Sequence, residues 1–130
     1  MSANYVFGKV VAGTHEEVVT RAIAQLAHEG FGVLSDIDVA ATLKKKLGKV
    51  IPPYRILGAC NPQFADKALE AEPQIGALLP CNVVVRVDRG GATIVEIMDP
   101  NAVLALVDRP EISAIASEVR ARLVRVLDAI

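Results

Sequence analysis

The sequence predicts one α+β domain: a mainly antiparallel, twisted sheet of about five strands with helices packed on one face. The chain has 130 residues, the usual size of a single domain, so we treat residues 1–130 as one unit. Short β-branched runs alternate with segments of helical periodicity, and the chain ends in a hairpin followed by an amphipathic helix. The expected order is β-α-β-α-β-α-β-β-α, which packs most simply as helices over one face of the sheet.

The first third of the chain predicts a strand, a helix and a second strand. Residues 4–11 are rich in valine and aromatic residues, which favour a strand. Thr14 and Glu17 have the spacing of a capping box, and the apolar residues behind them recur at helical intervals until Gly30. Residues 31–34 predict the second strand, so this part of the chain forms a strand–helix–strand crossover.

The middle of the chain predicts two helices separated by a strand. Asp38 is placed to cap a short helix that Gly48 closes. Residues 54–59 predict a strand, and the two prolines before it favour an extended start. At residues 61–62, a favoured N-cap asparagine precedes proline at the first helical position. The helix that begins there is expected to run to about Ala71.

The last third of the chain predicts the hairpin and the long helix. Residues 81–87 and 93–97 are β-branched runs, and the Arg-Gly-Gly sequence at 89–91 favours a turn between them. Asp-Pro at 99–100 predicts a short helix. The final helix begins at Pro110 and carries one continuous apolar stripe.

The amino-acid composition limits the kinds of partner that we expect. Hydrophobic residues make up 52% of the chain, and a domain this small hides only about two-thirds of its unfolded surface. The apolar excess therefore predicts self-association, most simply as a homodimer. The net charge of −1 gives no general attraction to nucleic acid or to a membrane surface. No apolar run approaches a membrane span, and the N-terminus lacks the regions of a signal peptide, so we expect a cytoplasmic protein.

The main chemical signal is the pair Cys60 and Cys81. Cys60 ends a predicted strand and directly precedes a helix start, where the helix dipole favours a thiolate and makes it more nucleophilic. Cys81 opens the next strand. The segment between them can lead out through one helix and return through a short turn, which would bring the two thiols together.

Three interpretations of this pair stay open. The cysteines can border a site for a small ligand or for a soft metal ion such as copper or zinc, with Asn61 and Asn82 shaping it. They can instead cycle between dithiol and disulfide in a thiol-redox enzyme, with Cys60 as nucleophile and Cys81 as resolving residue. In the third interpretation they are core residues of a structural or interaction module, since free cysteine is often buried. The spacing matches neither a Cys-x-x-Cys motif nor a four-ligand zinc motif.

Other chemistry-bearing residues favour structural roles. His15 and His28 are predicted on different faces of one helix, so they do not form a metal site within that helix. The glutamates at 16–17 suit a first helical turn, and Asp38 suits a cap. The lysines at 44–49 have no aromatic residue among them and predict a solvated helix face.

Two segments carry a resemblance to a known family. They are Tyr-Arg-Ile-Leu-Gly-Ala-Cys-Asn-Pro at residues 54–62 and Leu-Leu-Pro-Cys-Asn-Val-Val-Val at residues 78–85, and the Asp-Pro pair at 99–100 adds to them. Together these segments resemble the signature of the bacterial and archaeal domain of unknown function 302 (DUF302) family. The resemblance implies a compact α+β domain that associates. It implies no accepted activity.

Overall fold

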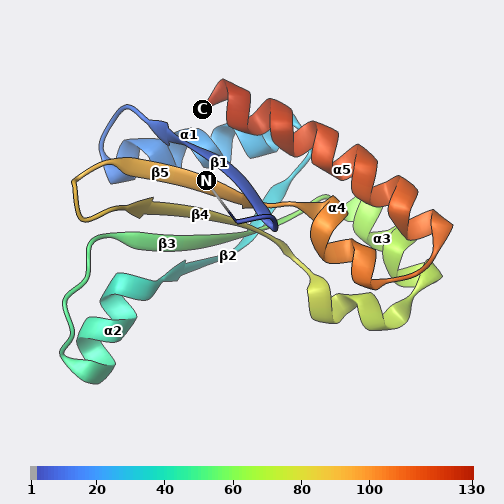
Figure 1. The fold of residues 1–130 in the computed structure, drawn as a ribbon, viewed down its shortest axis with the longest axis horizontal. Helices are drawn as coiled ribbons and strands as arrows, with labels where there is room; N and C mark the ends of the chain where they lie inside the picture. The colour runs from blue at the N-terminus through green and yellow to red at the C-terminus, as the bar shows by residue number, and fades with distance from the viewer. Residues whose placement is uncertain (1–2) are drawn as a thin grey trace.

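A computed structural model describes residues 3–130 and confirms the α+β class (Figure 1). Residues 1–2, part of the stretch considered for a signal peptide, lie outside this description. The described chain forms one five-stranded sheet in which every neighbouring pair is antiparallel. Across the sheet the strands are β1 (Val6–Val11), β5 (Thr93–Met98), β4 (Cys81–Val87), β3 (Tyr54–Cys60) and β2 (Gly32–Asp38).

The helices follow the expected order. They are α1 (His15–His28), α2 (Val39–Leu47), α3 (Pro62–Ala71), α4 (Pro100–Val103) and α5 (Pro110–Ala129), with 3-10 segments η1 (Pro73–Leu78) and η2 (Leu104–Leu106). The capping box is present: the Thr14 hydroxyl accepts from the Glu17 amide at 3.2 Å, and the Glu17 carboxylate accepts from the Thr14 amide at 2.9 Å. Asp38 caps α2, and Gly48 ends it in the left-handed conformation at φ 66°.

α1 crosses the whole sheet. It joins β1 at one edge to β2 at the other, and three strands lie between them. The two edge strands run in the same direction, because four antiparallel pairings separate them. The predicted strand–helix–strand crossover is therefore present, but its two strands are not neighbours.

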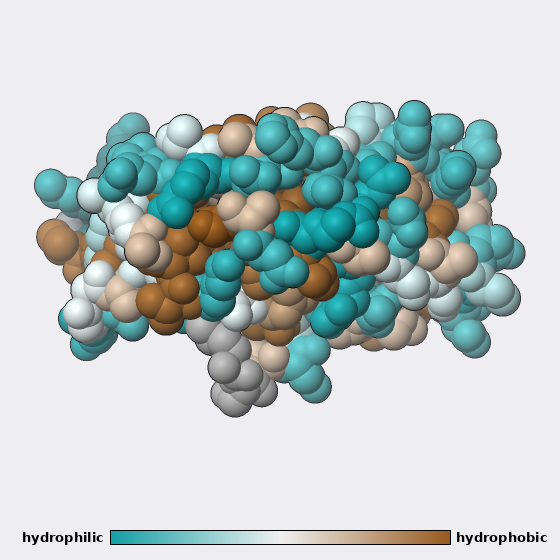
Figure 2. Space-filling view, turned by 90° about the horizontal axis from the view of Figure 1, so that it is seen from above, coloured by the Kyte–Doolittle hydropathy of each residue, from teal (hydrophilic) through white to brown (hydrophobic). Residues whose placement is uncertain are grey.

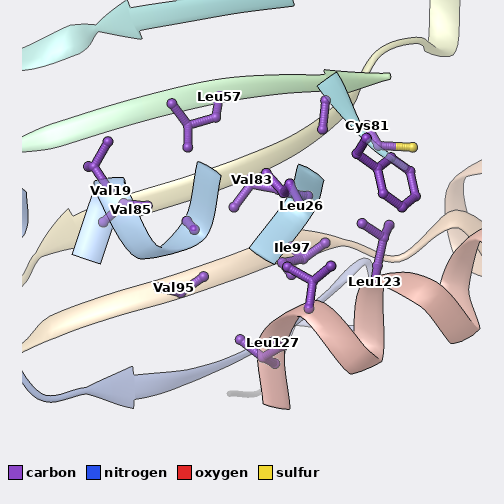
Figure 3. Close-up of a cluster of buried hydrophobic side chains, with 14 of the residues drawn as sticks. Val19, Leu26, Leu57, Cys81, Val83, Val85, Val95, Ile97, Leu123 and Leu127 are labelled. Atoms are coloured by element: carbon purple, nitrogen blue, oxygen red, sulfur yellow. The ribbon is translucent and has the colours of Figure 1, made fainter. Parts of the chain in front are cut away.

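The core lies between one face of the sheet and the helices α1 and α5 (Figure 3). Alternate residues of the three central strands point into it, and residues from both helices fill the space against them. Its fully buried members include Leu26, Leu57, Val83, Val85, Val95, Ile97 and Leu123. A second cluster joins α3, η1, η2 and α5 through Ala68, Ile75, Leu104, Ile112 and Ala116. The period-two burial of the strands is what a sheet with helices on one face requires.

β2 is the element that the sequence predicts least well. The expected strand covers residues 31–34, but the observed one continues to Asp38. Residues 35–38 are polar except for Ile37 and include two aspartates, which have low strand propensity. Hydrogen bonding to β3 overrides that propensity. A register shift between Val33 and Ser35 leaves Leu34 as the extra, bulged residue.

The surface carries both hydrophilic and hydrophobic side chains. Seen from the side of β1 and α5, hydrophilic side chains divide the exposed hydrophobic ones (Figure 2). Within residues 3–130 no helix has both the length and the apolarity needed to cross a membrane.

Candidate functional site

A cavity of about 280 Å³ lies at the end of the sheet, where β3 and β4 meet α3, η1 and α5. It separates the two hydrophobic clusters, since Phe31 and Val119 on its wall belong to the first and Ala68 and Leu104 to the second. Among residues 3–130, no charged residue lines it, and Asn61 is its only polar side chain apart from the two thiols. The cavity is therefore an almost wholly apolar space that opens from the core.

Both cysteines lie on the wall of this cavity. Ala59 and Cys81 are direct partners in the β3–β4 ladder, and Cys60 is the next and last residue of β3. Between them the chain leaves through α3 and returns through η1, as the spacing predicts. Both cysteines are free; Cys60 is half-buried and Cys81 is buried. In Figure 3 the Cys81 sulfur points away from the centre of the core.

Of the two asparagines, only Asn61 reaches the cavity. It is buried, and its side-chain oxygen accepts from the Phe64 amide at 3.4 Å, which makes it the predicted N-cap of α3. Asn82 is exposed and does not line the cavity. Because successive strand residues point to opposite faces, Asn82 faces away from the core when Cys81 faces toward it. The structure thus brings Cys60, Asn61 and Cys81 together, and leaves Asn82 outside.

Gly58 has a positional role that the strand pattern did not reveal. A Cβ atom at this residue would lie 2.2 Å from Ser35 Oγ and 2.8 Å from Pro80 Cγ. The proline ring cannot move away as a flexible side chain would, so this close approach requires glycine. Gly58 therefore allows Pro80 to pack on β3 directly before Cys81, and its place in the signature segment is the only sequence signal for this role.

The electrostatic environment keeps Cys81 neutral. Burial and, to a smaller extent, the nearby Cys60 thiol raise the pKa of the Cys81 thiol to about 11. Nucleophilic attack and metal ligation both use the thiolate. At neutral pH Cys81 is therefore an apolar wall residue with a thiol proton.

The two histidines, the remaining candidate metal ligands, do not line the cavity. Within residues 3–130 no group of three or more His, Cys, Asp or Glu side chains is arranged to hold a metal ion. His15 is half-buried, and its Nε2 lies 2.9 Å from the Val85 carbonyl oxygen, four residues along β4 from Cys81. His28 is exposed. The prediction that these histidines do not share one face holds, and His15 sits near the opposite end of the sheet from the cavity.

At that opposite end of the sheet, charged side chains form ion pairs with one another. Arg55 binds Asp36 through two hydrogen bonds, of 2.7 and 2.5 Å, and lies 3.1 Å from a Glu16 carboxylate oxygen. The hydrogen bonds from Arg55 hold the pKa of the Asp36 carboxyl below its usual value. The same bonds raise the pKa of Arg55. These groups satisfy one another, which fits a structural ion-pair network.

The comparisons with known proteins agree with the signature segments. The family model described as "Domain of unknown function DUF302" matches residues 7–130. A crystal structure of an uncharacterized conserved DUF302 protein from Bacillus stearothermophilus is similar to this chain, with a TM-score of 0.91 and 31% sequence identity over 98% of each chain. No curated protein matches the sequence. With the family model extending over nearly the whole sequence, the chain belongs to the DUF302 family.

Proposed function

We propose that this protein binds a small, uncharged apolar ligand in the cavity beside Cys60 and Cys81. The observation that carries the proposal is a space of about 280 Å³ without a charged lining residue. Ligand pockets are concave, mostly apolar and carry a few polar groups, and this volume is at the small end of their range. A charged ligand would lose its hydration there without gaining a partner.

Asn61 and Cys60 would give the bound ligand its polar contacts. Both line the cavity, and Cys60 is the more accessible of the two thiols. A neutral ligand with one hydrogen-bonding group matches this lining better than a pure hydrocarbon, because buried polar groups gain from a partner.

Thiol–disulfide exchange is the second candidate function. Cys60 directly follows the ladder partner of Cys81, and both cysteines line one cavity, which supports it. The raised pKa of Cys81 argues against this residue as the attacking thiol, and it also disfavours a copper or zinc site, which needs deprotonated thiols. Apolar binding uses the Cys81 thiol in the protonated state that burial favours.

The proposal includes self-association in the cytosol. Nine large hydrophobic side chains are exposed on the described surface, among them Leu34, Leu47 and Val50. Exposed apolar surface of this kind is typical of association sites when it is contiguous. Two cysteines are too few for a disulfide framework, which fits a reducing compartment.

Ligand binding is tested with 1-aminoanthracene, a neutral apolar dye whose fluorescence rises when it leaves water. We expect saturable binding to the wild-type chain with a dissociation constant on the order of micromolar. Ala65→Trp fills the cavity from α3 and should abolish binding. Ala121→Trp on the exposed face of α5 is the matched control and should bind as wild type does. Absence of saturable binding, or equal binding by Ala65→Trp with an unchanged melting temperature, would refute the proposal.

A further inference from the structure

β2 is a free edge of the sheet. Six of its seven residues are exposed, and it contains neither lysine nor proline, two residues that commonly protect edges from pairing. In the described chain, residues 32–37 make no backbone hydrogen bond outside the β2–β3 ladder. The other edge is better protected: β1 carries Lys9, and Val10 is the one exposed residue among its six. The protection of β2 is limited to its bulge at Leu34 and to Asp36 and Asp38, so β2 is the edge that is more open to a further strand.

α2, which follows β2, packs only loosely on its own chain, with Val39, Ala40 and Leu43 half-buried. None of its nine residues is buried, and Leu47 and nearby Val50 are 72% and 78% exposed. A helix this short is marginal in water unless an apolar face is packed against other structure. The capping by Asp38 and Gly48 fixes its ends but supplies no packing. The apolar side chains of α2 would therefore gain this packing from a surface outside the chain.

The cavity opens toward the same edge. Leu34, the bulged residue of β2, lines the cavity and is nevertheless 71% exposed. Leu69 of α3, also on the cavity wall, is 42% exposed. The mouth of the cavity is therefore bordered by two apolar side chains in contact with solvent, beside the free strand.

We propose that two copies of the chain pair antiparallel along β2, so that the partner's α2 covers the mouth of the cavity. In a two-fold antiparallel pair, the Asp38 end of one β2 lies beside the Gly32 end of the other. α2 follows the Asp38 end, and the cavity lies beyond the Gly32 end. In Figure 1, α2 extends past the β2 edge at one end of the sheet, and η1 with α3 extends past it at the other. This inference deepens the proposed ligand cavity and rests on it.

Charge favours a second copy as the occupant. Residues 39–49 carry four lysines and no acidic residue, so α2 and the loop after it form a basic arm. On α3, next to Leu69, Asp66 and Glu70 are exposed four residues apart, and Lys67 is the only basic residue of that helix. A partner of the same sequence thus brings a basic helix with an apolar side chain to an acidic helix with an apolar side chain. Each protomer would supply to the other's cavity the cover that it lacks.

Edge pairing is tested with matched charge substitutions. Ile37→Lys places a charge on β2, and Val10→Lys places one on β1, the opposite edge. Both side chains are exposed, at 50% and 64%. Light scattering should give twice the 13.8 kDa chain mass for the wild type and Val10→Lys, and the single-chain mass for Ile37→Lys. A monomeric wild type, or dissociation by Val10→Lys alone, would overturn the pairing.

The position of the partner's α2 is tested by zero-length carbodiimide cross-linking of mixed light and heavy-nitrogen-labelled protein. The reagent joins a lysine amine to a carboxylate as an amide with loss of water. We expect mixed-isotope links between lysines 44–49 and Asp66 or Glu70. Links found only within one isotope label would contradict the proposed cover.

Closure of the cavity is separated from ligand binding by the release rate of 1-aminoanthracene. We expect release from Ile37→Lys to be about tenfold faster than from the wild type, because the mouth is uncovered. Ala65→Trp should remain a dimer. A dimer that binds no dye refutes the ligand cavity and leaves the pairing intact. Equal release from wild type and Ile37→Lys refutes closure and leaves ligand binding intact.

Discussion

The two ends of β3 face opposite environments. At its start, Arg55 is held by Asp36 and Glu16 in an ion-pair network at the surface. At its end, Cys60 borders a cavity that no charged residue lines. The seven residues of β3 thus connect a region where Arg55 is paired with two carboxylates to a region where a volume is left unfilled.

The charged end of β3 contributes to stability, whereas the cavity end is suited to binding. The charged end gains from contacts that are complete within one chain. The cavity end forgoes the dispersion contacts that a filled core would make, since side chains beside a void lack partners on one side. Natural proteins often give up stability at a site that function requires. We therefore expect the two ends to respond differently to charge, to pH and to loss of side chains.

A charge placed at the cavity end should have the largest effect. Cys81→Asp puts a carboxylate into an apolar, buried position without a partner, which should lower the free energy of unfolding by more than about 4 kcal/mol. Asn82→Asp changes the neighbouring exposed residue and should cost less than about 0.5 kcal/mol. Urea denaturation followed by circular dichroism measures both. Equal stability of the two variants would show that the Cys81 side of the cavity is open to water.

Alkaline pH should lower the free energy of unfolding through Cys81, at the cavity end of β3. Burial raises the pKa of Cys81 from an ordinary value of 9.0 to about 11, so the folded state holds the thiol proton more tightly than the unfolded state. The contribution of this group is complete below pH 9 and is lost as pH rises through 11. The loss amounts to about 3 kcal/mol. Denaturant melts of wild type and Cys81→Ala at pH 9 and pH 11 give the free energy of unfolding of each. The loss is the change in this free energy between the two pH values for the wild type minus the change for Cys81→Ala.

Cys60→Ala is the control for that experiment, because it retains the buried thiol. It should keep most of the alkaline loss of stability. If Cys81→Ala loses as much stability as the wild type between the two pH values, the titrating group is another one.

Much of the fold could be predicted from the sequence because its signals are local. The capping box of Thr14 and Glu17, the Asn61-Pro62 helix start and the alternating residues of β4 each act within a few residues. Local signals also underestimate the length of β2. Its polar second half is held by pairing with β3, a contact that local propensity does not contain.

The cavity was only partly predictable. The spacing of Cys60 and Cys81 around a helix and a turn correctly indicated that the chain returns to the same end of the sheet. The sequence did not indicate the empty volume, because it arises where two hydrophobic clusters meet and fail to fill the space between them. Asn82 was expected beside Cys81, but strand alternation directs the two side chains to opposite faces.

The smallest effect is expected at the charged end of β3. Arg55 and Asp36 form a two-bond pair, and the Asp36 side chain is 36% exposed, so water and salt weaken the attraction. A double-mutant cycle of Arg55→Met and Asp36→Asn should give a coupling free energy of about 1 kcal/mol, and less at high salt.

The pH dependence of this pair has the opposite sign to that of Cys81. Because the pKa of Asp36 is lowered in the folded state, its contribution is present above pH 3.8 and is lost as pH falls through the lower folded value. Acid should therefore abolish the coupling between Arg55 and Asp36 while Cys81 stays protonated and unaffected. A coupling that persists at pH 2 would mean that packing of the Arg55 stem, and not its charge, joins the two residues.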